Sequence, residues 1–130
     1  MRSKRVIDTS FVSSLVVADD VNHQKAIKLY LDLKPGTALI APRTVQLEAL
    51  HVAERLDSHD SMVSFLKKLK VRWVDIDEGF MRKYAKFFKG KKANLKPIDS
   101  TIWFLATTIK ANVLSFDRKL LRAVDAGFGK

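Results

Sequence analysis

Short runs of apolar residues alternate with longer amphipathic stretches along the chain. The short runs, at positions 6–7, 38–40, 71–76 and 113–114, have the length and composition of buried strands. The longer stretches repeat apolar residues every three or four positions, which indicates helices; they cover 11–17, 22–33, 44–56, 58–69, 78–88, 98–109 and 117–123. This alternation predicts an α/β fold with a mainly parallel central β-sheet flanked by α-helices.

Proline and glycine occur where this pattern needs helices to begin or end. Pro35 and Gly36 follow the second helical stretch, Gly90 follows the fifth, and Pro42 and Pro97 stand where first helical turns are expected. Four apolar residues of the second stretch share one face of the expected helix; they are Ala26, Leu29, Tyr30 and Leu33.

Composition indicates the number of domains and the cellular compartment of the protein. The 130 residues, 47% of them hydrophobic, fit a single domain over 1–130 with a substantial core. Cysteine is absent, which excludes disulfides and thiolate metal sites and suits a cytoplasmic protein. No apolar segment is long enough to span a bilayer, and Asp8 interrupts the apolar N-terminal stretch, so we expect neither membrane insertion nor a signal peptide.

The charge balance points to a polyanionic partner. Lysine and arginine number 24 against 14 acidic residues, which gives a net charge of +10. A basic surface attracts nucleic acid and releases its counterions, so nucleic acid is the leading partner. An anionic membrane surface and a lysine-rich surface that serves only solubility are the alternatives.

Two acidic residues follow predicted strands. Asp8 comes directly after the run at 6–7, and Asp117 follows the run at 113–114 by two residues. Parallel strands present their carboxyl ends at one edge of the sheet, which is where ligands bind in such folds. We therefore expect Asp8 and Asp117 to lie close together.

Two further acids lie on predicted helices, and each has a structural alternative. Asp99 falls in the first turn of the stretch at 98–109, where a carboxylate also compensates the helix dipole. Glu48 lies beside the apolar face of the stretch at 44–56, and an ion pair with Arg55 would explain it equally well. Carboxylates held together repel one another unless a cation neutralises them, and oxygen ligands without His or Cys suit Mg²⁺ or Mn²⁺.

The surroundings of these acids resemble the ordered acidic motifs of PIN-domain nucleases. The matching segments are Val6–Phe11, Thr44–Glu48, Pro97–Ile102 and Leu114–Asp117, and the closest type is the VapC-like toxin ribonuclease. The resemblance extends from Arg5 to about Leu121. Two details depart from the family pattern: Ser100 and Thr101 follow Asp99 where small Ala-rich residues are frequent, and Ser115 replaces a frequent threonine.

The resemblance implies a fold, a reaction and partners. It implies a parallel sheet of about five strands, although a terminal edge strand could be short because the chain stops soon after Phe128. It also implies an endoribonuclease that depends on Mg²⁺ or Mn²⁺, forms homodimers and is inhibited by a cognate antitoxin. Its catalytic and metal-binding residues would be Asp8, Glu48, Asp99 and Asp117, with Asp8 and Asp99 as principal ligands and hydroxyl support from Thr9 or Ser10 and from Ser115.

Three other functions stay open at this stage. The chain could be a catalytically silent RNA- or partner-binding PIN module, a housekeeping RNA-processing nuclease, or a structure-specific DNA nuclease. Retention of four mutually repelling carboxylates argues against the silent module.

The segment 67–96 is strongly basic and carries aromatic residues. It holds eleven lysines or arginines and three acids, a net charge of +8. We expect its aromatic residues to pack mainly in the core and four of its lysines to face the substrate; these are Lys89, Lys91, Lys92 and Lys96. The histidines His23, His51 and His59 lack metal-site spacing and are expected at the surface or at helix caps.

Overall fold

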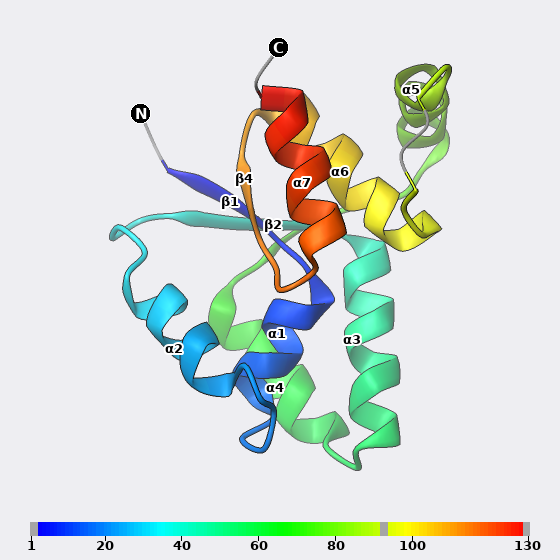
Figure 1. Cartoon of the computed structure of the whole chain (residues 1–130). Helices are drawn as coiled ribbons and strands as arrows, with labels where there is room; N and C mark the ends of the chain where they lie inside the picture. Colours follow the sequence, from blue (N-terminus) through cyan, green and yellow to red (C-terminus); the bar gives the residue numbers. More distant parts are fainter. Residues whose placement is uncertain (1–2, 92–93, 129–130) are drawn as a thin grey trace.

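The computed structural model describes residues 3–91 and 94–128 as a parallel sheet covered by helices (Figure 1). The strands are β1 (Lys4–Ile7), β2 (Ala38–Pro42), β3 (Arg72–Val74) and β4 (Asn112–Leu114). The helices in these residues are α1 (Thr9–Val16), α2 (His23–Leu31), α3 (Arg43–Arg55), α4 (His59–Leu69), α5 (Glu78–Phe88), α6 (Pro97–Ile109) and α7 (Arg118–Phe128). The predicted α/β architecture is confirmed.

The strand order is β3-β2-β1-β4, and every pairing is parallel. The expectation of about five strands is wrong for the described residues, which form four. The sequence offers only four apolar runs of strand type, and the chain beyond β4 continues as α7, which buries Leu120 and Val124 instead of adding an edge strand.

Burial on both faces explains why the central strands are continuous apolar runs. All five residues of β2 are buried, and Val6 and Ile7 of β1 are inaccessible to solvent. In the view of Figure 1, helices α1 to α4 lie below the strands and α5 to α7 above them. Helix α6, which begins with Pro97 and buries Ile102 and Leu105, packs against β1 and β2 and so fixes where its first turn lies.

Helix α2 buries only part of the apolar face that its sequence predicts. Its inward residue Ala26 is fully buried, but Leu29 and Tyr30 are 39% and 38% exposed. The helix packs on α1 along one side, so only a narrow stripe of its surface is covered. In the described residues no helix is long and apolar enough to cross a membrane.

Candidate active site

The ends of β1 and β4 bring Asp8 beside Ser115. Ile7 and Leu114 are partners in the sheet register, and the Asp8 backbone N–H donates to the Leu114 carbonyl oxygen at 3.1 Å. Asp8 is only 3% exposed and caps α1 by accepting from the Thr9 N–H at 2.7 Å. Its position at a strand end was predicted; its second role as the helix cap follows from the abrupt turn into α1.

Two serine hydroxyls hold the other oxygen of this carboxylate. Ser10 and Ser115 donate to Asp8 Oδ2 at 2.9 and 2.7 Å, and their own oxygens lie 3.2 Å apart. The Thr9 hydroxyl is buried and has no hydrogen-bond partner among the described residues. Of the two neighbours expected to support the acid, Ser10 therefore contacts it through its side chain, and Thr9 through its backbone.

The same serine network positions Asp117. Its N–H donates to Ser115 Oγ at 2.9 Å, and its carboxylate accepts from the N–H groups of Lys119 and Leu120 at 3.0 and 3.2 Å. Asp117 thus caps the first turn of α7 from a loop that is tied to the end of β1 through Ser10, which accepts from the Phe116 N–H at 3.0 Å.

Asp99 and Glu48 approach from α6 and α3, which pack together. The Thr44 and Thr101 hydroxyls lie 3.0 Å apart across these two helices, close to both acids. Asp99 and Glu48 are each half-buried. In the described part of the chain no ion pair joins Glu48 to Arg55, so the structural alternative for Glu48 is not realised.

The electrostatics show that the four acids act on one another. Burial raises the pKa of Asp99 to about 6, with further increases from the charges of Asp8, Asp117 and Glu48 and from a hydrogen bond with Asp117 that favours the protonated form. Burial also raises the pKa of Asp8, against the lowering effect of hydrogen bonds from Ser115, Ser10 and Thr9, and the Glu48 charge raises it further.

All four acids line one cavity of about 720 Å³. Its wall also includes Thr9 and Ser10, two of the residues that support Asp8, and several residues from the helices around it. The full set is Asp8, Thr9, Ser10, Ser13, Glu48, His51, Val52, Arg55, Lys96, Pro97, Ile98, Asp99 and Asp117. The structure therefore brings together the acids that the sequence places in four separate segments.

The cavity suits a hard divalent cation. Its acidic donors are carboxylate oxygens. Burial and, after it, the charges of the neighbouring carboxylates raise the pKa of Asp99, and a bound cation would offset both effects. Across the residues that the structure describes, no three acidic, histidine or cysteine side chains converge tightly enough to enclose an ion. A divalent cation that is held by one or two carboxylates together with water and substrate phosphate, as Mg²⁺ commonly is, needs no such enclosure.

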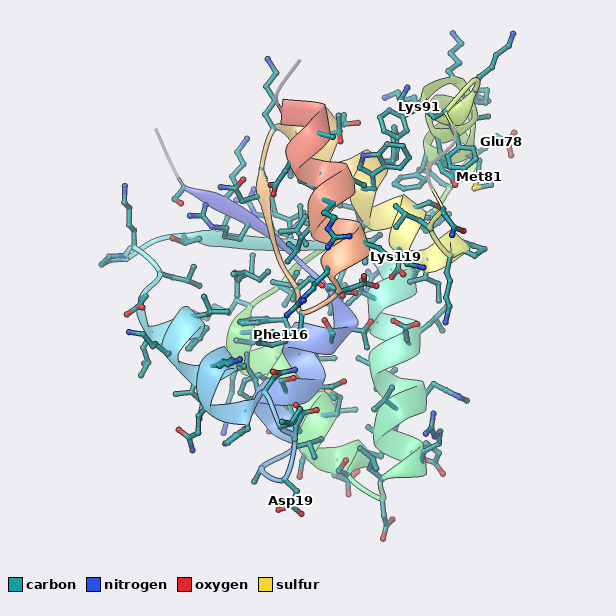
Figure 2. All side chains as sticks on the ribbon, viewed as in Figure 1. Asp19, Glu78, Met81, Lys91, Phe116 and Lys119 are labelled. Atoms are coloured by element: carbon teal, nitrogen blue, oxygen red, sulfur yellow. The ribbon has the colours of Figure 1, made fainter. Side chains whose placement is uncertain are left out.

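The four expected substrate lysines lie in different settings. Lys96 lines the acidic cavity, and Lys89 is exposed at the end of α5. Lys91 donates to the Phe87 carbonyl oxygen and lies 4.3 Å from the centre of the Phe87 ring (Figure 2). Lys92 lies outside the described residues.

Most of the aromatic residues of the basic segment are half-buried and pack against the core, which the prediction placed them in. Phe87 contacts Trp103 and Phe104 of α6, with ring centres 4.8 and 5.3 Å apart. Tyr84 packs on Phe104 and its hydroxyl lies 2.6 Å from Ser100 Oγ, which anchors α5 next to Asp99.

Sequence reasoning missed His51, Arg55 and Ser13 as part of the cavity wall. His51 was expected at the surface or at a cap, and Arg55 as a partner of Glu48. Spacing could have found both, because residues three and seven positions after Glu48 lie on the same face of a helix. Ser13 lies one turn after Thr9 on α1, and its hydroxyl is buried with no partner in the described part of the chain.

Comparison with known proteins places this site in context. Residues 5–126 match the PIN domain family. No curated protein matches the chain. Among solved structures, the fold is similar to VapC20 of Mycobacterium tuberculosis, a Sarcin-Ricin loop cleaving toxin, with a TM-score of 0.76, 21% identity and coverage of 93% of this chain and 95% of that one.

Proposed function

The chain belongs to the PIN domain family, and from this premise we propose that it is a divalent-metal-dependent endoribonuclease. The observation that carries the proposal is the convergence of Asp8, Glu48, Asp99 and Asp117 on one cavity. There, burial and three neighbouring carboxylates raise the pKa of Asp99 to about 6. Perturbed pKa values of this kind cluster at functional sites, and a bound cation would relieve the repulsion between the carboxylates.

In this proposal Asp8 and Asp99 are the principal ligands of Mg²⁺ or Mn²⁺, and Glu48 and Asp117 complete the acidic pocket. A bound divalent cation supplies Lewis acidity that makes water nucleophilic and stabilises a leaving oxygen. Ser10 and Ser115 hold Asp8 in one orientation through its Oδ2 atom. The family resemblance implies that water attacks phosphorus in line and that the P–O3′ bond breaks. The products then carry a 5′-phosphate and a 3′-hydroxyl, and no covalent enzyme intermediate forms.

RNA is the proposed substrate, and a toxin role is the proposed biology. The net charge of +10 favours a polyanion, and the structurally similar VapC20 is a Sarcin-Ricin loop cleaving toxin. The Sarcin-Ricin loop is therefore the first RNA to test. A cytoplasmic location, a homodimer and an inhibitory antitoxin partner belong to the same proposal and are supported by the family resemblance.

Neutralising the principal acids tests the enzyme assignment. We predict that Asp8→Asn and Asp99→Asn each reduce RNA cleavage at least a hundredfold while leaving the circular dichroism spectrum unchanged. Asp19→Asn is a matched control, because Asp19 is exposed on the turn between α1 and α2 (Figure 2). Cleavage should also stop in a chelator and return with Mn²⁺. Undiminished cleavage by purified Asp8→Asn or Asp99→Asn would show that the active site is assigned wrongly.

The alternatives separate in two further measurements. A silent binding module would bind RNA but show no heat of Mn²⁺ binding in calorimetry and no cleavage. A structure-specific DNA nuclease would cut hairpin or flap DNA faster than RNA of the same sequence in a parallel assay. The proposal expects Mn²⁺ binding that Asp99→Asn weakens, and preference for RNA.

A further inference from the structure

The acidic cavity is flanked by positive charge on two sides. Four carboxylates repel a polyanion, so cations at the margins are needed to bring a phosphate chain across them. The described residues supply such cations from α3 on one side and from α7 and the segment before α6 on the other.

The first flank follows one face of α3. His51 and Arg55 lie three and seven residues after Glu48, and both line the same cavity as the acids. Arg55 is exposed, and none of the ion pairs among the described residues involves it. At 1.5 Å per residue, Arg55 lies roughly 10 Å from Glu48 along the helix axis, within reach of a phosphate next to the one being cleaved.

The second flank lies on α7 and on the segment before α6, which Figure 1 shows near the end of α3 that is remote from Arg55. Lys96 lines the cavity itself, and the preceding residue Leu95 lines a neighbouring hollow of about 390 Å³. Lys119 and Arg122, one turn apart on α7, line that hollow. Lys119 lies in the first turn of α7 (Figure 2), two residues after Asp117 in the sequence.

We infer that single-stranded RNA crosses the acidic cavity from Arg55 and His51 to Lys96, Lys119 and Arg122. Flanking phosphates meet the cations, and the phosphate between them meets the carboxylates and their cation. Arginine suits such contacts because its guanidinium donates two parallel hydrogen bonds to phosphate. This path rests on the proposed ribonuclease function and adds to it the surface that holds the substrate.

Two other basic residues are committed to contacts within the protein. Lys91 is held by the Phe87 carbonyl oxygen and ring, and Arg43 pairs with Asp75 at 2.8 Å. Arg55, Lys119 and Arg122 have no such ion pair within the residues described, which leaves their charge available to a ligand.

Binding and cleavage should be measured separately. Binding uses the Asp99→Asn protein with a short fluorescein-labelled single-stranded RNA of mixed sequence, so that cleavage does not consume the probe. In this background we expect Arg55→Gln and Arg122→Gln each to weaken affinity about tenfold. Each should also reduce the slope of log affinity against log salt by about 1. Arg82→Gln on α5, which removes the same charge from an exposed position, is the control and should change neither quantity.

In the active protein the same substitutions should raise KM more than they lower kcat, because they remove binding that is made before the reaction. Arg55→Lys should retain the salt slope while losing part of the affinity. Equal effects of Arg55→Gln and Arg82→Gln, or no effect of either, would overturn the path.

These outcomes also separate the path from the proposed function. If the unaltered chain cleaves RNA, and Arg55→Gln and Arg122→Gln bind and cleave it equally well, the proposed path is wrong but the ribonuclease function is supported. If the chain never cleaves RNA but binds it through Arg55 and Arg122, the path stands and the ribonuclease assignment is wrong. Unchanged thermal melting of the variants shows that these exposed substitutions preserve the fold.

Discussion

Asp8 and Asp99 have different environments although both are proposed metal ligands. Asp8 is almost fully buried, and its two carboxylate oxygens accept three hydrogen bonds from Thr9, Ser10 and Ser115. Asp99 is half-buried, and its environment disfavours charge through burial and three neighbouring carboxylates. Hydrogen bonds therefore hold the Asp8 carboxylate in one orientation, whereas the pKa of Asp99 is the one that should fall when a cation binds.

This difference predicts a pH-dependent stability. In the metal-free protein the pKa of Asp99 lies at about 6, above its ordinary 3.8, so its ionised form destabilises the fold above about pH 6. We expect Asp99→Asn to be more stable than the unaltered chain above that pH, and the difference to disappear as pH falls toward 3.8. Urea unfolding in a chelator measures it. A stability difference that is constant across this range would contradict the assignment.

At the scale of elements, the site depends on two parallel strands ending at the same level. The register pairs Ile7 with Leu114, so the residues that follow, Asp8 and Ser115, meet at 2.7 Å. The Ser115 hydroxyl also accepts from the Asp117 N–H. This one oxygen, just after β4, therefore orients both Asp8 and Asp117.

Removal of that hydroxyl should alter the chemistry more than the fold. Ser115→Ala leaves Asp8 without the hydrogen bond that most lowers its pKa, so the acid limb of the pH–rate profile should move to higher pH. We expect cleavage near neutral pH to fall about tenfold and the free energy of unfolding to fall by about 1 kcal/mol. Measurement of kcat/KM across pH tests this.

Ser115→Thr is the matched variant, because it keeps the hydroxyl. It should retain the pH profile of the unaltered chain. An acid limb that stays in place in Ser115→Ala would show that Ser115 does not act through Asp8.

At the scale of the whole molecule, the site exists only in the folded chain. The acids come from the end of β1, from α3, from the first turn of α6 and from the loop after β4. In the unfolded chain these segments are dispersed, so a cation that needs them together binds the folded state and stabilises it.

Mn²⁺ should therefore raise the melting temperature. At a hundredfold excess over Kd the stabilisation is about 2.7 kcal/mol, which corresponds to a rise of several degrees. A chelator should reverse the rise, and Asp99→Asn should lose most of it, whereas Asp19→Asn should keep it. Differential scanning fluorimetry measures all four conditions. An equal rise in Asp99→Asn would place the cation elsewhere.

Much of the architecture could be read from local pattern. The apolar runs at 6–7, 38–40, 71–76 and 113–114 contain or overlap β1 to β4, and the seven amphipathic stretches correspond to α1 to α7. Local rules fail where burial depends on neighbours: Leu29 and Tyr30 share a face with Ala26, yet α1 covers only the part of α2 around Ala26.

The sequence by itself determined the elements, their alternation and the identity of the acids, because periodicity, caps and residue chemistry act over a few neighbouring positions. Only the tertiary structure decided which acids meet. The order β3-β2-β1-β4 places β1 beside β4 and so joins Asp8 to Ser115 across 107 positions. Packing of α3 on α1 and α6 directs Glu48 and Arg55 to the same cavity without pairing them. Such pairings depend on which surfaces bury each other, which no short window of sequence contains.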